Sequence, residues 1–173
     1  MRKAQASAAQ DLRSVGRHVV ATAALLLAVA ACSGGGRSSS PTTTQSSTTS
    51  TTRHVTVREW ALPSLPYVQK MEADFAAVQT AAKSGLDAVR SNAATLADDA
   101  RGFRLALASS GPPPPAAAIV GPAVVEATSG LEQASRALAA CIGSDCLPKI
   151  STVNTAVGSW GSALQELTKH LND

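Results

Sequence analysis

The stretch PYVQKMEADFAAVQTAAKSGLDAVRSNAATLADDARGFRLAL, residues 66–107, decides the fold. Its apolar residues recur at every third or fourth position, which places them on one face of an α-helix. This face consists of Val68, Met71, Phe75, Val78, Ala82, Leu86, Val89, Ala93, Leu96, Ala100, Phe103 and Leu107. Ser64 and Pro66 are typical of a helix start, with a capping hydroxyl before a proline in the first turn.

The same stretch contains a candidate break. A single helix of about 42 residues would be ~63 Å long and would extend beyond later helices of about 25 residues. Lys83-Ser84-Gly85 offers an exit, with a cation in the last turn and a glycine for a left-handed residue, and Asp87 suits the next first turn. We therefore predict helices at 66–83 and 86–108, with one long kinked helix as the alternative.

Two further helices follow a proline-rich connection. Ser109 to Pro115 ends the second helix, and its four prolines favour an extended loop, with a docking site for a proline-reading domain as the alternative. Apolar periodicity then predicts helices at 116–141, where Pro122 marks the true start or a kink, and at 147–171. The sequence therefore predicts an all-α, up-down-up-down four-helix bundle over residues 59–173, or a three-helix bundle with a long kinked first helix.

The residues before the first helix, 54–66, show a different pattern. Val55 and Val57 alternate with polar residues, which suggests a short extended piece. Trp60 follows without helical order, and we expect this segment to lay Trp60 against the bundle.

A second apolar run, VVATAALLLAVAAC at residues 19–32, lies near the N-terminus behind the basic residues Arg2, Lys3, Arg13 and Arg17. With Val29-Ala30-Ala31-Cys32 at its end, it resembles the signal peptide and lipobox of bacterial lipoproteins. The resemblance implies cleavage after Ala31 and a diacylglyceryl thioether on Cys32, and hence lipid anchoring at the extracytoplasmic face of the cell membrane. The 13 apolar residues before Cys32 are short for a spanning helix of about 20 residues, and plain secretion is the other alternative.

The segment between Cys32 and the predicted bundle is polar. Ser33–Thr52 contains only Ser, Gly, Thr, Arg, Pro and Gln, so we expect a disordered stalk, either bare or O-glycosylated. The predicted organisation is a signal peptide at 1–31, a lipidated cysteine with a flexible linker at 32–58, and a bundle at 59–173.

The formal net charge of +3 belongs to the signal peptide. Residues 1–31 contain four basic residues and one acidic residue, whereas residues 32–173 contain 11 of each. A neutral mature chain has no net field that attracts phosphate backbones, so we expect no binding to nucleic acid.

No residue set matches a catalytic, cofactor or metal site. His54 and His170 lack a second ligand at helical spacing. Asp98-Asp99 has Arg101 close by, which favours a solvated ion pair over a catalytic carboxylate pair. Only the packing could bring it a second carboxylate, from Glu72, Asp74, Glu126, Glu132 or Glu166. We therefore predict a protein that is not an enzyme.

The sequence Gly158-Ser159-Trp160-Gly161-Ser162 places two glycines inside a predicted helix. They favour close approach of a neighbouring helix, with Trp160 filling the space. The alternative is a ligand pocket beside Trp160 and Met71, in which case the bundle would carry an apolar small molecule in a cavity of about 300 Å³ or more.

Cys141 and Cys146 are the two cysteines that remain if Cys32 is acylated. In a continuous helix five residues rise about 7.5 Å, which exceeds the usual Cα separation of a disulfide, so a bond requires the helix to end between them. Ile142-Gly143-Ser144-Asp145 supplies such an end, and Pro148 suits the next first turn. We predict this disulfide, with two free thiols or a redox pair as alternatives.

Taken together, these features predict an envelope lipoprotein that binds an unknown envelope protein or component.

Overall fold

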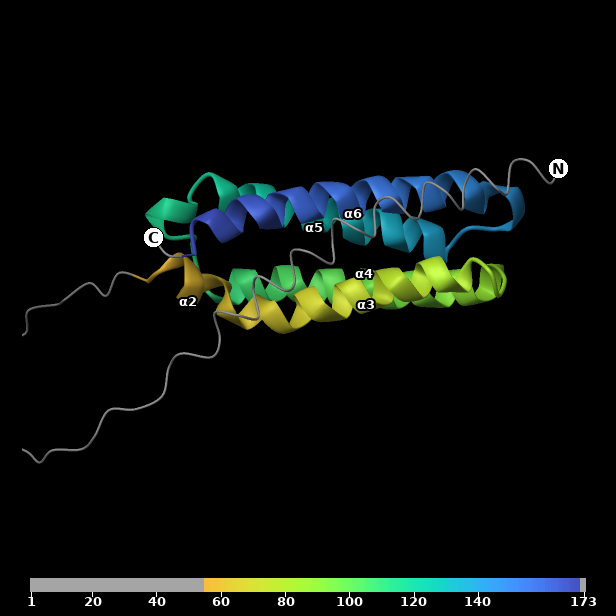
Figure 1. Cartoon of the computed structure of the whole chain (residues 1–173), viewed down its shortest axis with the longest axis horizontal. Helices are drawn as coiled ribbons and strands as arrows, with labels where there is room; N and C mark the ends of the chain where they lie inside the picture. Colours follow the sequence, from red (N-terminus) through yellow and green to blue (C-terminus); the bar gives the residue numbers. More distant parts are fainter. Residues whose placement is uncertain (1–54, 172–173) are drawn as a thin grey trace, which may run out of the picture.

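The computed structural model describes residues 55–171, and this part of the chain is all-α (Figure 1). The four long helices are α3 (Leu65–Ala81), α4 (Leu86–Ser109), α5 (Val120–Ala139) and α6 (Cys146–Lys169). The shorter elements are α2 (Val57–Ala61) and the 3₁₀ turns η1 (Leu62–Ser64), η2 (Pro115–Ala117) and η3 (Gly143–Asp145). Consecutive long helices run antiparallel, with α3 and α4 in one layer and α5 and α6 in the other. The predicted up-down-up-down bundle is confirmed; the signal peptide, Cys32 and Ser33–Thr52 lie outside the described residues.

The break at residues 82–85 gives two helices rather than one long kinked helix. Gly85 has a φ of 127°, which a residue with a Cβ rarely adopts. Asp87 lies in the first turn of α4, where its charge favours the helix dipole, and its carboxylate is 3.6 Å from Arg90. The chain therefore reverses here, and α4 packs back along α3.

The predicted extended piece around Val55 and Val57 is wrong, because Val57 begins the helix α2. Thr56 and Glu59 form a capping box: Thr56 Oγ1 accepts from the Glu59 amide at 3.1 Å, and Glu59 Oε2 accepts from the Thr56 amide at 3.1 Å. The pair supplies partners for two backbone amides that a helix start would otherwise leave unpaired. The ordered domain thus begins before residue 59.

Ser64 does not cap α3 as predicted. Its buried hydroxyl donates to the carbonyl oxygen of Ala61 at 2.7 Å, and its backbone is already helical. The turn η1 therefore leads directly from α2 into α3, with Pro66 in the first turn of α3.

Trp60 attaches α2 to the connection between α4 and α5. This agrees with the prediction that Trp60 lies against the bundle. Its side chain is 3% exposed, and its Nε1 donates to the carbonyl oxygen of Gly111 at 3.0 Å. A Cβ added to Gly121 would lie 3.1 Å from Trp60 Cη2 and 3.0 Å from Pro113 Cβ, so the packing around this glycine is tight. The proline run is therefore a packed connection, and α5 begins at Val120, later than the predicted residue 116, with Pro122 in its first turn.

The core lies between the two layers and consists mainly of alanine, valine and leucine side chains. Its largest pair is Phe103 of α4 with Trp160 of α6, whose rings meet edge to face with centroids 6.3 Å apart. The prediction of close approach at Gly158 is wrong, since a Cβ added there would meet nothing within 4 Å. Gly161 is buried, and at Gly102 an added Cβ would overlap the ring of Tyr67, so this side chain packs directly against the α4 backbone.

The predicted disulfide between Cys141 and Cys146 is present and crosses the turn between α5 and α6. Their Cα atoms are 5.1 Å apart, and both residues are buried. Gly143 takes the predicted left-handed conformation, with a φ of 59°. The sequence offers Ser144 or Asp145 as the N-cap of α6. Asp145 occupies that position but makes no capping hydrogen bond through its side chain.

Candidate functional site

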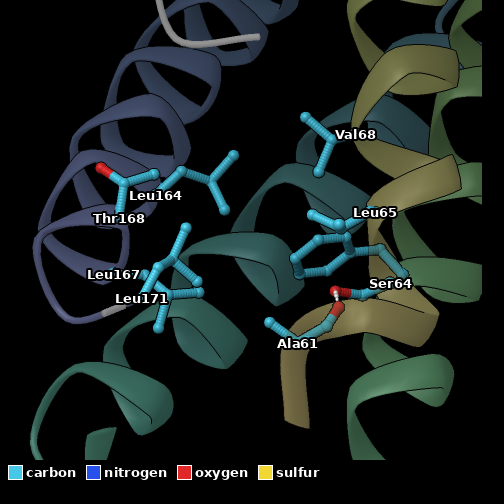
Figure 2. Close-up of a pocket in the computed structure, with 9 residues that line it drawn as sticks. Ala61, Ser64, Leu65, Val68, Leu164, Leu167, Thr168 and Leu171 are labelled. Carbon is cyan, nitrogen blue, oxygen red and sulfur yellow. Dashed lines mark hydrogen bonds between the residues drawn. The ribbon is translucent and has the colours of Figure 1, made fainter. Parts of the chain in front are cut away.

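A small cavity lies between α3 and α6, near the ends of the helices where η1 meets α3 (Figure 2). Leu164 and Leu167 of α6 face Leu65 and Val68 of α3 across it. The other lining residues are Ala61, Ser64, Phe103, Thr168 and Leu171. Its volume is about 10 Å³, which is room for a single water molecule. A carrier for an apolar molecule needs a cavity of about 300 Å³ or more, which this space does not provide as packed.

Trp160 and Met71, the two predicted ligand contacts, do not line this cavity. Both side chains are 1% exposed and belong to the packed core. The favoured reading of Trp160 as a packing residue is therefore confirmed.

An ion-pair network joins α4 to α5 on the surface of the bundle. Glu132 accepts from Arg104 at 2.8 Å and from Arg136 at 3.2 Å. The i, i+4 spacing of Glu132 and Arg136 in the sequence predicts the second of these pairs. Asp98 contacts Arg136 at 3.4 Å rather than the predicted Arg101. Burial alone would raise the pKa of Glu132, but the hydrogen bonds and charges of the two arginines outweigh it and lower that pKa. The Glu132 carboxylate therefore binds both arginines and is stabilised in its ionised form.

A second acidic cluster lies between α3 and α4, where Asp74 faces Asp99. Asp74 Oδ2 is buried and has no hydrogen-bond donor within reach among the described residues. Burial, a hydrogen bond to Asp99 and the charge of Asp99 together raise the pKa of Asp74 to about 6, against a smaller opposing effect of Lys70. Lys70 lies 3.9 Å from Asp99 and 5.1 Å from the centre of the Tyr67 ring.

Glu72 is a third carboxyl group on α3 with an altered affinity for protons. It is half-buried, and burial raises its pKa to about 7. The sequence pattern identified Glu72 and Asp74 only as acidic residues that packing could bring to a partner. In the structure, packing brings Asp74 next to Asp99. It does not bring Asp74 to Asp98, because Asp98 faces Arg136.

This cluster binds protons but does not form a recognisable catalytic site. The pKa of Asp74 is raised to about 6, whereas a general acid would also need a cleft for its substrate. Within residues 55–171, no group of three or more His, Cys, Asp or Glu side chains could hold a metal ion. His170 follows the last residue of α6, and His54 lies outside the described residues.

We predict that the domain loses stability as pH rises from about 4 to 7. The folded-state pKa values of Asp74 and Glu72 lie above those of the unfolded chain, so the folded protein holds more protons in this range. Their stabilising effect is complete below pH 4 and is lost as pH passes 6 to 7. Because both groups are partly exposed and screened, we expect a total change of only about 1 kcal/mol. Urea unfolding at a series of pH values measures it.

Asp74→Asn is the decisive variant for this prediction. It removes one charge of the facing pair, and we expect it to raise stability at pH 7.5 and to flatten the decline between pH 4 and 7. Asp98→Asn is the matched control, because Asp98 lies next in sequence to Asp99 but is 75% exposed and faces Arg136. If Asp74→Asn destabilised the protein at pH 7.5, the facing carboxylates would not repel each other as described.

No described helix is both long enough and apolar enough to cross a bilayer. Searches of protein-family models, of curated proteins and of solved structures found no match to this chain.

Proposed function

We propose that this protein is a lipoprotein of the bacterial cell envelope, anchored by a lipid on Cys32, that presents a non-enzymatic helical bundle at the extracytoplasmic face of the membrane. The observation that carries the proposal is the sequence Val29-Ala30-Ala31-Cys32 at the end of a 13-residue apolar run with basic residues before it. A run of this length is short for a spanning helix. The bundle would then bind an envelope protein or component. Residues 59–173 contain 8 basic and 11 acidic residues, so the bundle has no positive net charge to attract nucleic acid.

Three features of the described domain support a binding or structural role. The core is filled, with a cavity of about 10 Å³ between α3 and α6, so the interior is not arranged as a ligand site. The acidic cluster at Asp74 and Asp99 lies within a helix-packing interface rather than in a cleft. The disulfide between Cys141 and Cys146 suits an oxidising compartment, where such bonds form and persist.

The test of the anchor is the mass and location of the mature protein. We expect the native protein to begin at Cys32 and to carry the added mass of a diacylglyceryl group on that residue. Cys32→Ala removes the only acceptor for this lipid, so the variant should leave the membrane fraction or accumulate as an uncleaved precursor. Intact-mass measurement and membrane fractionation follow both outcomes.

The control is Cys141→Ala with Cys146→Ala, which removes the other two cysteines and leaves the lipobox intact. This double variant should remain in the membrane fraction. A native protein without acyl mass at Cys32, or a Cys32→Ala variant that stays fully membrane-bound after cleavage, would contradict the proposal.

A further inference from the structure

The end of the bundle at which the described chain begins carries exposed apolar side chains. We call it the proximal end; it contains α2, η1, the connection from α4 to α5 and the end of α6 (Figure 1). Leu62 is 55% exposed and Ile119 is 89% exposed. Pro63, Ala116 and Ala118 are also exposed. We call these five residues the proximal patch.

The segments that form this patch are free of charge. Residues 60–69 and 105–125 contain no Asp, Glu, Lys or Arg. Charged residues occur at the proximal end on α2 and at the end of α6, beside these two segments rather than within them. Exposed apolar residues at the opposite, distal end alternate with charges instead, since Leu86, Ile142 and Leu147 stand among Lys83, Asp87, Asp145 and Lys149.

The two segments of the proximal patch are held together by Trp60. The Trp60 indole donates to the carbonyl oxygen of Gly111 and packs against Gly121. Trp60 is two positions before Leu62, and Gly121 is two positions after Ile119, so the two segments are in direct contact. Pro114, which belongs to the connection between α4 and α5, is buried. The backbone of both segments is therefore held in place by the folded domain, and a partner would not have to order it on binding.

The length of chain between Cys32 and the domain limits how far the domain can lie from whatever holds Cys32. Only 22 residues separate Cys32 from Val55. Fully extended, they span at most about 75 Å, which keeps the domain at an effective concentration of about millimolar near whatever holds Cys32. Even a weak surface contact becomes well occupied at that concentration.

We propose that the proximal patch rests on the lipid surface to which the chain is attached, with Leu62 and Ile119 inserted at the boundary between head groups and acyl chains. This inference rests on the proposed lipid anchor at Cys32. An uncharged apolar patch fits a bilayer interface because it loses no charged groups from water on contact. The distal end, with the disulfide turn, then points away from the membrane and is free for other partners.

The test attaches the mature chain to vesicles and compares its two ends. With Cys141 and Cys146 bonded, Cys32 is the one free thiol, so it can be coupled to a maleimide phospholipid in phosphatidylethanolamine–phosphatidylglycerol vesicles. Hydrogen exchange of residues 109–119 should slow about threefold or more relative to protein coupled to a soluble maleimide, as expected for two-thirds occupancy of the contact. Exchange of residues 141–145 at the distal turn should not change.

Two matched double variants complete the test. Leu62→Asp with Ile119→Asp should restore the exchange rate of the soluble form, whereas Ile142→Asp with Leu147→Asp should leave the protection in place. All four positions are exposed, and circular dichroism checks that both variants fold. No protection at the proximal end, or equal protection at both ends, would overturn the proposal. A contact that appears only when envelope proteins are added would also overturn it in favour of a protein partner.

This design separates the two proposals. The synthetic coupling supplies the attachment, so a lack of acylation in the cell would remove the proposed anchor without altering the vesicle result. An acylated native Cys32 together with an unprotected patch would preserve the anchor and remove only the contact.

Discussion

Trp160→Ala should lower the free energy of unfolding by about 3–5 kcal/mol, the usual cost of truncating a buried aromatic side chain to alanine. Trp160 is 1% exposed and packs edge to face on Phe103. The other core residues around it are small, so few of them can move to fill the space. A domain of this size has a total stability of about 5–15 kcal/mol, and the variant should be close to its unfolding limit. Urea unfolding followed by circular dichroism measures the change.

The phenylalanine variants of the two tryptophans provide a sharper comparison. Trp160 Nε1 is buried without a hydrogen-bond partner among the described residues, whereas Trp60 Nε1 donates to Gly111. Trp160→Phe keeps a ring and removes an unpaired N–H, so it should cost far less than Trp160→Ala. Trp60→Phe loses a hydrogen bond as well as ring volume, and it should cost about 1 kcal/mol more than the same change at Trp160. The reverse order would mean that the Trp160 indole has a partner.

Cys141→Ala with Cys146→Ala should lower the free energy of unfolding by about 2 kcal/mol. The bond closes a loop between residues only five apart in sequence, and constraining so short a loop in the unfolded chain gives a stabilisation of this order. In thermal unfolding the change corresponds to a decrease of roughly 8 °C in Tm. The effect should be independent of the pH response of Asp74, because Asp74 and Asp99 lie between α3 and α4 whereas the bond lies in the turn between α5 and α6.

Reduction of the wild-type protein is the control for this variant. A reductant should shift the wild-type unfolding curve toward that of the double variant and should leave the double variant unchanged. Thiol titration of unfolded, unreduced protein gives a direct count. Two free thiols at Cys141 and Cys146 would contradict both the bond and the expected loss of stability.

The sequence was sufficient to predict the number, order and direction of the long helices. Apolar periodicity identified their buried faces except at the first turn, where Ala82 and Leu86 are exposed because the chain leaves the helix there. Gly85 and Gly143 identified two of the turns, because a positive φ is accessible to glycine at little cost. The disulfide followed from the cysteine count together with the geometric need to end a helix between Cys141 and Cys146. Each of these inferences depends on residues that are close together in the sequence.

The helix α2 was missed although its signal is local. Thr56 and Glu59 have the spacing of a capping box, but the alternation of Val55 and Val57 suggested an extended strand instead. A helix of five residues is too short to show periodicity, and Trp60 stabilises it through contacts with residues about fifty positions away. Tertiary contact thus decided between two weak local preferences.

The candidate site could not be predicted for a different reason. The pairing of Asp74 with Asp99, and of Asp98 with Arg136, depends on how α3, α4 and α5 are rotated and shifted against one another. Periodicity defines the buried face of each helix but leaves the shift along its axis open. The close contact of Tyr67 with Gly102 sets that shift between α3 and α4, and a single sequence does not reveal such a contact.

The position of Trp60 also determines how the domain would respond to mechanical force. For a chain held by a lipid at Cys32, tension enters the domain at Val55 and passes into α2. It first meets the contacts of Trp60 with Gly111 and Gly121, before it can reach α3. The force is therefore transmitted through Trp60 to the connection between α4 and α5. If α2 detached, the tension would no longer act on that connection. A sharp pull would peel this short helix away first, while the four long helices remained packed.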